Sequence, residues 1–145
     1  AMIEMTRVTR PGGVVAAAVW DYGDGMEMLR VFWEEAVDLN PAASDRDERR
    51  MPLCRRGELG ALWRGHQLQH VVERPLTIGM QFTSFDDYWL PFLGNQGPAG
   101  DYVSTLGSRE REQLRLRVRR RLLGDRPDGQ IGLHARAWAV RGRVP

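Results

Sequence analysis

Histidine and cysteine are the residues whose chemistry is easiest to recognise in this sequence. His66 and His70 lie four residues apart, a spacing that would place two metal ligands on one face of a helix. Gly65 weakens a helix at that point, and no third or fourth ligand follows. Cys54 is the single cysteine, so it forms no internal disulfide and no metal cluster. We expect no metal site, and a general-base role for either histidine stays open.

Two adjacent carboxylates, Asp86 and Asp87, are a second candidate for acid–base chemistry. Adjacent residues of a helix point in different directions, so the two carboxylates would not readily share a proton. Their place near the start of a helical segment predicts instead that they face the N–H groups of a helix N-terminus. The sequence therefore assigns no catalytic residue.

Two groups of residues are candidates for contacting a substrate. Trp20 and Asp21 end an apolar run, and α/β proteins bind ligands at the carboxyl ends of their strands. The alternative for this pair is a buried tryptophan followed by a turn aspartate. The second group is aromatic and would either line an apolar acceptor pocket or pack in the core; it comprises Phe32, Trp33, Phe85, Tyr88, Trp89 and Phe92.

Arginines are concentrated between residues 109 and 126, at positions 109, 111, 115, 117, 119, 120, 121 and 126. Leu114, Val118 and Leu122 recur every four residues in this segment, which predicts an amphipathic helix with solvated arginines. No aromatic residue alternates with the arginines, and the net charge of the chain is only +2. Binding of nucleic acid is therefore not expected.

The order of the predicted elements indicates one α/β domain spanning residues 1–145. The apolar run Val14–Trp20 predicts a strand covered on both faces, as in a parallel sheet. Further strands are expected at 71–82, where Pro75 is a candidate break, and at 129–143. Helices are expected at 3–9, at 24–39 with Asp24 as N-cap, and at 57–65, 84–93 and 108–123, with loops at 41–56 and 94–100.

The opening of the chain resembles a known family. Glu4-Met5-x-Arg7-Val8-x-Arg10-Pro11-Gly12-Gly13, followed by an apolar strand ending in Val19-Trp20-Asp21, is similar to a pattern of class I S-adenosylmethionine-dependent methyltransferases. In that pattern a helix and a Pro-Gly-Gly turn lead into the fifth strand; Thr9 stands where leucine is usual. An antiparallel strand pair then closes the sheet. The resemblance implies the C-terminal half of a Rossmann-like methyltransferase sheet, about three strands with flanking helices.

The same resemblance implies that the cofactor-binding half is absent from these residues. The family holds S-adenosylmethionine with a glycine-rich loop after the first strand and an acidic residue at the end of the second. Neither is found here, and the glycine-rich segment Gly94–Gly100 lacks GxGxxG spacing. We therefore expect a truncated, methyltransferase-related protein that is inactive alone and binds no cofactor by itself. Its family transfers a methyl group from S-adenosylmethionine to a small acceptor.

A three-stranded α/β chain would leave the first strand without a neighbour. An apolar edge strand such as Val14–Val19 favours pairing with another chain. We expect a homodimer through this strand, or a missing N-terminal half beside it. The alternative function is accordingly a non-catalytic dimeric binding or assembly module. No apolar run is long enough to cross a bilayer and no secretory leader is recognisable, so a cytoplasmic protein is expected.

Overall fold

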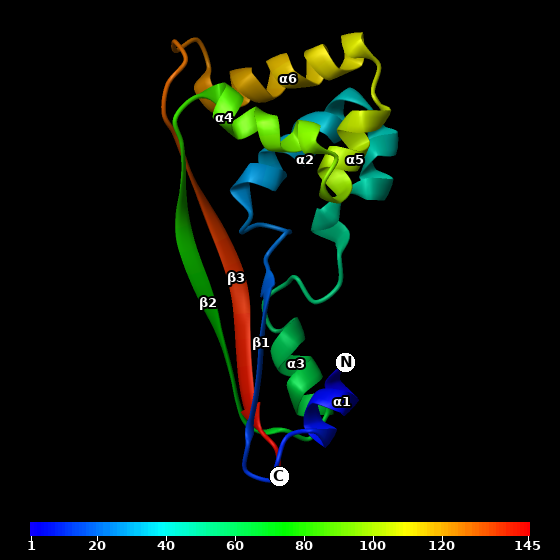
Figure 1. Ribbon diagram of the computed structural model, residues 1–145, viewed down its shortest axis with the longest axis vertical. Coiled ribbons are helices and arrows are strands. Elements are labelled where there is room, and N and C mark those ends of the chain that lie inside the picture. The colour runs from blue at the N-terminus through cyan, green and yellow to red at the C-terminus, as the bar shows by residue number, and fades with distance from the viewer.

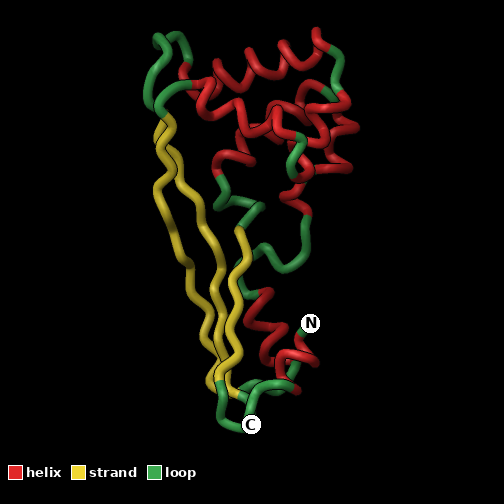
Figure 2. Tube along the Cα trace, in the orientation of Figure 1, coloured by secondary structure: helices red, strands yellow, loops and turns green.

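The computed structural model describes residues 1–145 and shows an elongated molecule with a sheet along its length and a cluster of helices at one end (Figures 1 and 2). The α-helices are α1 (Met2–Arg7), α2 (Glu27–Leu39), α3 (Glu58–Gly65), α4 (Phe85–Trp89), α5 (Gly97–Thr105) and α6 (Ser108–Leu123). The strands are β1 (Val14–Trp20), β2 (Gln69–Phe82) and β3 (Ile131–Arg143). Three short 3-10 helices span Pro41–Arg46, Glu48–Arg50 and Leu90–Gly94. None of the helices has the length and hydrophobicity needed to cross a membrane.

The three strands form one sheet in the order β1-β3-β2, and β3 is antiparallel to both neighbours. Val14 lies opposite Arg143 at one end of the β1–β3 pair, and Trp20 lies opposite Ala137 at the other. The mixed α/β class is therefore confirmed. The expectation that β1 is covered on both faces, as in a parallel sheet, is wrong: its side chains alternate between exposed and more buried positions.

The helical end, formed by α2, α4, α5 and α6 with the start of β3, encloses the larger core of 16 buried residues. Phe32 and Trp33 of α2 lie on the face that the amphipathic spacing predicted, and both are fully buried. Leu114 and Val118 of α6 enter the same core, which confirms the apolar stripe expected for that helix. Helices α4, α5 and α6, which follow later in the chain, thus cover the apolar face of α2.

The sheet base, formed by β1, α1, α3 and the second half of β3, has a smaller core of seven buried residues. The indole Nε1 of Trp63 in α3 donates a hydrogen bond to the Val15 carbonyl at 3.1 Å. Glu73 of β2 accepts hydrogen bonds of 2.6 Å from the backbone N–H groups of Gly57 and Gly60 at the start of α3. These contacts fix α3 against one face of the sheet.

The two cores lie on opposite faces of β3. Ile131 and Ala135 are buried near its start, whereas Trp138 and Val140 are buried further along. Side chains alternate between the faces of a strand, so the buried side changes from odd to even positions. Ala137 and Ala139 therefore lie on the same sheet face as Ile131. The helical end covers this face only around the start of β3. Below that end, the same face has no covering layer.

Several predicted element boundaries need correction. α2 begins at Glu27 with Met26 at its N-cap, and Asp24 lies in the preceding turn, where its N–H donates to the Asp21 side chain. β2 continues through Pro75, since it is an edge strand, where proline is tolerated. Segments expected to be loops contain the 3-10 helices after α2 and helix α5, which begins at Gly97 with Pro98 in its first turn.

Candidate functional site

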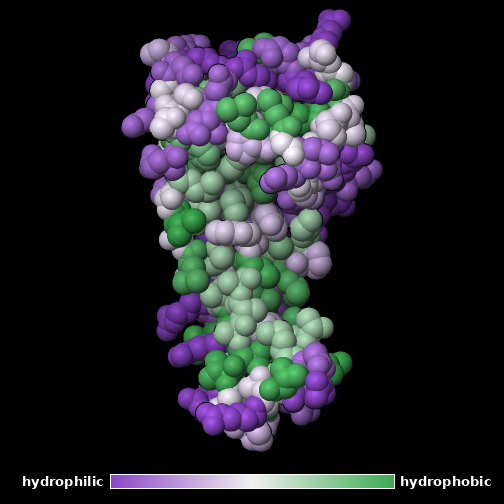
Figure 3. All heavy atoms as spheres, viewed as in Figure 1, coloured by the Kyte–Doolittle hydropathy of each residue, from purple (hydrophilic) through white to green (hydrophobic).

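The principal candidate site is an apolar pocket of about 960 Å³ beside the carboxyl end of β1. Nine of its ten lining residues are hydrophobic. The ten residues come from β1, the turn after it, the segment after the second 3-10 helix, β2 and β3: Ala18, Val19, Trp20, Tyr22, Met51, Pro52, Cys54, Leu76, Ile78 and Ala137. Figure 3 shows hydrophobic residues gathered over the strands, in contrast to the largely hydrophilic surface of the helical end. The pocket is suited to an apolar group.

The polar atoms that line this pocket are uncharged at neutral pH. Burial raises the pKa of the Cys54 thiol and the carboxylates of Glu58 and Asp21 add to the rise, although a hydrogen bond with the Tyr22 backbone opposes it. Burial likewise raises the pKa of the Tyr22 hydroxyl. A cysteine acts as a nucleophile through its thiolate, so a raised pKa makes Cys54 unreactive. The pocket therefore offers binding surface and no nucleophile.

Trp20 and Asp21, predicted as a pair, have different surroundings. The Trp20 side chain is 40% exposed and lines the pocket. Asp21 is only 3% exposed, and its Oδ2 accepts a hydrogen bond of 2.8 Å from Arg136 Nε. Its Oδ1 accepts a second bond of 3.0 Å from the Asp24 N–H. Asp21 thus ties the end of β1 to β3 and has no carboxylate oxygen directed at a ligand.

The ionisation of Asp21 reflects these contacts. Burial by itself raises the pKa of the carboxyl. The Asp24 N–H, the Arg136 guanidinium and the Gly25 N–H together outweigh burial and lower the pKa below its usual value. The buried carboxylate is therefore ionised and paired at neutral pH, which is the state of a structural ion pair.

The aromatic candidates lie in the core of the helical end. Phe32 stacks on Phe92 with ring centroids 4.5 Å apart, and its ring is nearly perpendicular to Trp33 at 5.1 Å. Phe85 stacks on Trp89 at 6.1 Å. None of these rings lines the pocket beside β1. Their own packing fills the space, which favours the core interpretation over an acceptor pocket.

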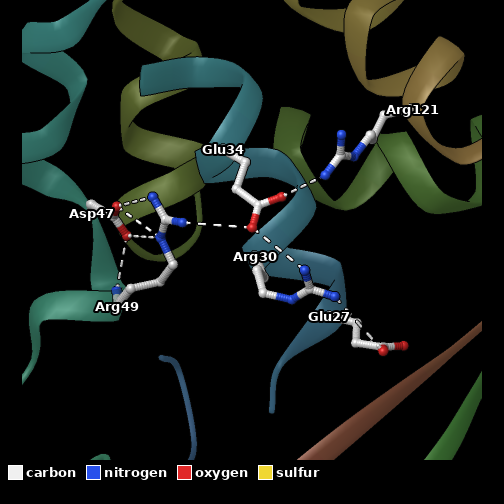
Figure 4. Close-up of polar contacts among 6 residues, drawn as sticks. All are labelled: Glu27, Arg30, Glu34, Asp47, Arg49 and Arg121. Atoms are coloured by element: carbon white, nitrogen blue, oxygen red, sulfur yellow. Dashed lines mark hydrogen bonds and ion pairs between the residues drawn. The ribbon is translucent and has the colours of Figure 1, made fainter. Parts of the chain in front are cut away.

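A charged network covers the helical end (Figure 4). Glu34 of α2 is near the centre of this network, with guanidinium nitrogens of Arg30 at 3.4 Å and Arg121 at 3.3 Å. Arg117 pairs with Glu35 at 3.0 Å and also with Asp38. These contacts join α6 to α2, and they favour the prediction that the arginine-rich segment is a solvated helix face. Beneath the network, the buried Glu48 accepts a hydrogen bond of 3.0 Å from the Trp33 indole.

The remaining sequence candidates do not form a site. His66 is the C-cap after α3 and His70 lies in β2 with a φ of 51°. No group of three metal-ligating side chains is present in the chain. Asp87 accepts a hydrogen bond of 2.8 Å from the Thr83 N–H, and Asp86 pairs with Arg115 at 2.8 Å. Only Asp87 therefore serves the start of α4 as predicted, whereas Asp86 joins α4 to α6.

Sequence reasoning missed most of the pocket. Leu76 and Ile78 were recognised as an alternating apolar pattern in β2, and such a pattern alone does not distinguish a covered face from an open one. Met51 and Cys54 lie in a polar segment and gave no signal, because only the folded chain brings them beside β1. No model of a known protein family matches the chain, and a search of curated proteins also finds no match.

Proposed function

We propose that these residues are the C-terminal, substrate-side half of a class I S-adenosylmethionine-dependent methyltransferase and are inactive alone. The opening motif supports this proposal, because α1 and a turn with Gly12 at a φ of 73° lead directly into β1. The expected antiparallel closing pair corresponds to β2 and β3. Each described strand is antiparallel to its neighbour, so the parallel strands of a Rossmann-like sheet would belong to the missing half.

The side chains of this chain do not fit the cofactor. Asp21, the carboxylate at the end of β1, is engaged by Arg136 and the Asp24 N–H and is not free to hold ribose hydroxyls. The glycines of Gly94–Gly100 belong to the end of a 3-10 helix and the start of α5 and do not follow a strand. In the family, S-adenosylmethionine supplies the methyl group. We derive no step of that transfer from the residues of this chain.

The single observation that carries the substrate-side role is the apolar pocket at the carboxyl end of β1. Trp20, Leu76 and Ile78 expose large side chains there, and such pockets exclude water around an apolar ligand. The acceptor expected from this lining is small and uncharged over the part that enters the pocket, since burying a charge without a partner costs several kcal/mol or more.

The test combines ligand-induced stabilisation with probe binding. We expect saturating S-adenosylhomocysteine to leave the melting temperature unchanged, because a ligand stabilises only the folded state it binds. We expect Nile red, a neutral apolar dye, to bind with increased emission, and Leu76→Lys to abolish that binding. Leu116→Lys is the matched control, since Leu116 is also an exposed leucine but lies on α6.

Two results would contradict the proposal. A rise of several degrees with S-adenosylhomocysteine would show that a cofactor site exists in this chain, and the claim of inactivity would fail. Equal loss of dye binding in the Leu76→Lys and Leu116→Lys proteins, or no binding at all, would remove the substrate-side role from the pocket.

A second candidate function, a non-catalytic dimeric assembly module, is favoured by a different observation. β1 is an edge strand whose exposed side chains are apolar or small. Soluble proteins usually protect such edges with charges, proline or a covering element. This candidate predicts a stable dimer, whereas the methyltransferase proposal by itself predicts no particular oligomeric state.

A further inference from the structure

The hydrogen-bond pattern identifies which backbone groups of β1 are free. The Asp21 N–H bonds to the Arg136 carbonyl, and the Val144 N–H bonds to the Gly13 carbonyl. In an antiparallel pair, residues that bond to the partner strand alternate with residues whose N–H and C=O point away from it. The odd-numbered residues of β1 therefore face β3. The even-numbered residues, Val14, Ala16, Ala18 and Trp20, direct their backbone groups to the open edge.

The two edges of the sheet differ in their protection. β2, at one edge, contains Glu73, Arg74 and Pro75 in succession. Charged residues and proline at an edge discourage pairing with another strand. β1, at the other edge, has the sequence VVAAAVW, with no charged residue and no proline. The edge that is competent to pair is therefore β1.

We propose that β1 pairs with β1 of a second copy of this chain, antiparallel about a two-fold axis at Ala17. This inference rests on the second candidate function above and competes with the acceptor pocket, because Ala18 and Trp20, which line that pocket, would contact the partner strand in the dimer. A two-fold antiparallel pair that uses the outward backbone groups must match even-numbered residues with even-numbered residues. Only the register centred on Ala17 pairs all four of them. It places Val14 opposite the partner subunit's Trp20, and Ala16 opposite the partner subunit's Ala18.

The side chains of β1 are self-complementary in this register. Val14 is 52% exposed and Trp20 is 40% exposed in the single chain, and each would bury its apolar surface against the other. The alanines between them present little bulk, so the two strands approach to the normal spacing of about 4.8 Å. The result is a continuous six-stranded sheet, which lies within the usual size range of about four to six strands.

Charge does not oppose this pairing. Arg141 and Arg143 lie on β3, one strand behind the interface. Three inter-strand spacings, roughly 14 Å, would separate β3 from its symmetry mate. That distance exceeds the Debye length of about 8 Å at physiological ionic strength, so repulsion between solvent-exposed arginines is largely screened.

Cysteine cross-linking tests the register directly. In a Cys54→Ala background, Ala17→Cys places two thiols at the two-fold axis, where the Cα atoms of a pair that is not hydrogen-bonded lie about 4.5 Å apart. This separation lies within the range that a disulfide spans. Ala16→Cys is the matched control, because its symmetry mate lies diagonally, about 7–8 Å away. We expect Ala17→Cys to form a covalent dimer under mild oxidation, and Ala16→Cys to form far less.

Light scattering on further variants separates edge pairing from other modes of association. We expect a dimer at tens of micromolar for the unmodified chain and for Leu76→Lys, which alters the same sheet face on the opposite edge strand. Ala18→Pro removes an outward N–H and no bond within the sheet, so we expect a folded monomer. A monomeric unmodified chain, a dimeric Ala18→Pro protein, or equal cross-linking at residues 16 and 17 would overturn the proposal. Neither the cross-linking nor the light-scattering result depends on cofactor binding.

Discussion

The helical end and the sheet base of this protein achieve burial to very different extents. The helical end packs 16 residues between its helices and the start of β3, and ion pairs between α2 and α6 cover its surface. The sheet base buries seven residues beneath two helices of six and eight residues on one face. Its other face exposes Leu76 and Ile78, each 54% accessible.

This difference separates the sources of stability from the surfaces available for binding. A closed core stabilises the fold through removal of apolar area from water and leaves little that a ligand can reach. An apolar face without a covering layer contributes less to folding, and such faces commonly mark interaction or ligand sites. Mutations should therefore affect stability at the helical end, and binding or association at the sheet base.

The largest expected effect is a break in the aromatic core. Phe32→Ala removes a fully buried ring that stacks on Phe92, and truncations of this kind cost about 3–5 kcal/mol. Urea denaturation followed by circular dichroism measures the free energy of unfolding. Leu116→Ala, on the exposed side of α6, is the control and should change it by about 0.5 kcal/mol or less. Similar losses in the two variants would mean that the helical end is loosely packed.

The second effect concerns the ion pair that joins the end of β1 to β3. Arg136→Ala leaves the buried Asp21 carboxylate without its guanidinium partner, at a cost of about 1–3 kcal/mol at pH 7. Arg120→Ala, at an exposed position with no ion pair, controls for loss of charge and should have little effect.

The pH dependence of this effect has a defined sign. The pKa of Asp21 is lowered in the folded state, so its ionised form stabilises the fold above the unfolded pKa of about 3.9. This contribution is lost as the pH falls through the folded pKa. The difference between the Arg136→Ala and parent proteins should therefore shrink below about pH 4. A constant difference down to pH 2 would exclude the ion pair as its origin.

A smaller effect of opposite sign is expected at Glu48. Burial raises the pKa of this carboxyl, and the negative charge of Asp47 adds to the rise, although the Trp33 hydrogen bond opposes it. A raised pKa means that ionisation destabilises the fold as the pH increases from the unfolded towards the folded value. Glu48→Gln can keep a hydrogen-bond acceptor for Trp33 without the charge.

We therefore expect Glu48→Gln to stabilise the protein by about 1 kcal/mol or less at pH 7.5. The gain should disappear near pH 4, where the parent carboxyl is protonated as well. Thermal melting at the two pH values measures both quantities, with Glu112→Gln, an exposed carboxylate on α6, as the control. A loss of stability at pH 7.5 would show that the ionised carboxylate is well accommodated.

The smallest effect on stability is expected on the open sheet face. Ile78→Thr changes an exposed side chain in an edge strand and keeps β-branching, so the free energy of unfolding should change by about 0.5 kcal/mol or less. Nile red binding should nevertheless weaken, because Ile78 lines the pocket. A large loss of stability would mean that this face is more buried in solution than in the single chain.

Local pattern was sufficient to predict most of the elements of the fold. The spacing of apolar residues predicted α6 with its observed bounds, and it located all three strands. It failed at Asp24, which lies in a turn before α2 and not at its N-cap, and at α5, where a glycine and a proline begin a helix. The candidate site was predicted only in part, with Trp20 as the one candidate that lines the pocket.

The sequence by itself determined which residues are apolar and how they alternate along each helix and strand, because these properties depend on near neighbours. Only the tertiary structure decided which apolar residues are buried. Phe32 and Trp33 are enclosed because α4, α5 and α6 fold over α2, whereas Leu76 and Ile78 stay exposed because no element covers their face. Burial depends on contacts between segments distant along the chain, and hydrophobic pattern does not specify those contacts.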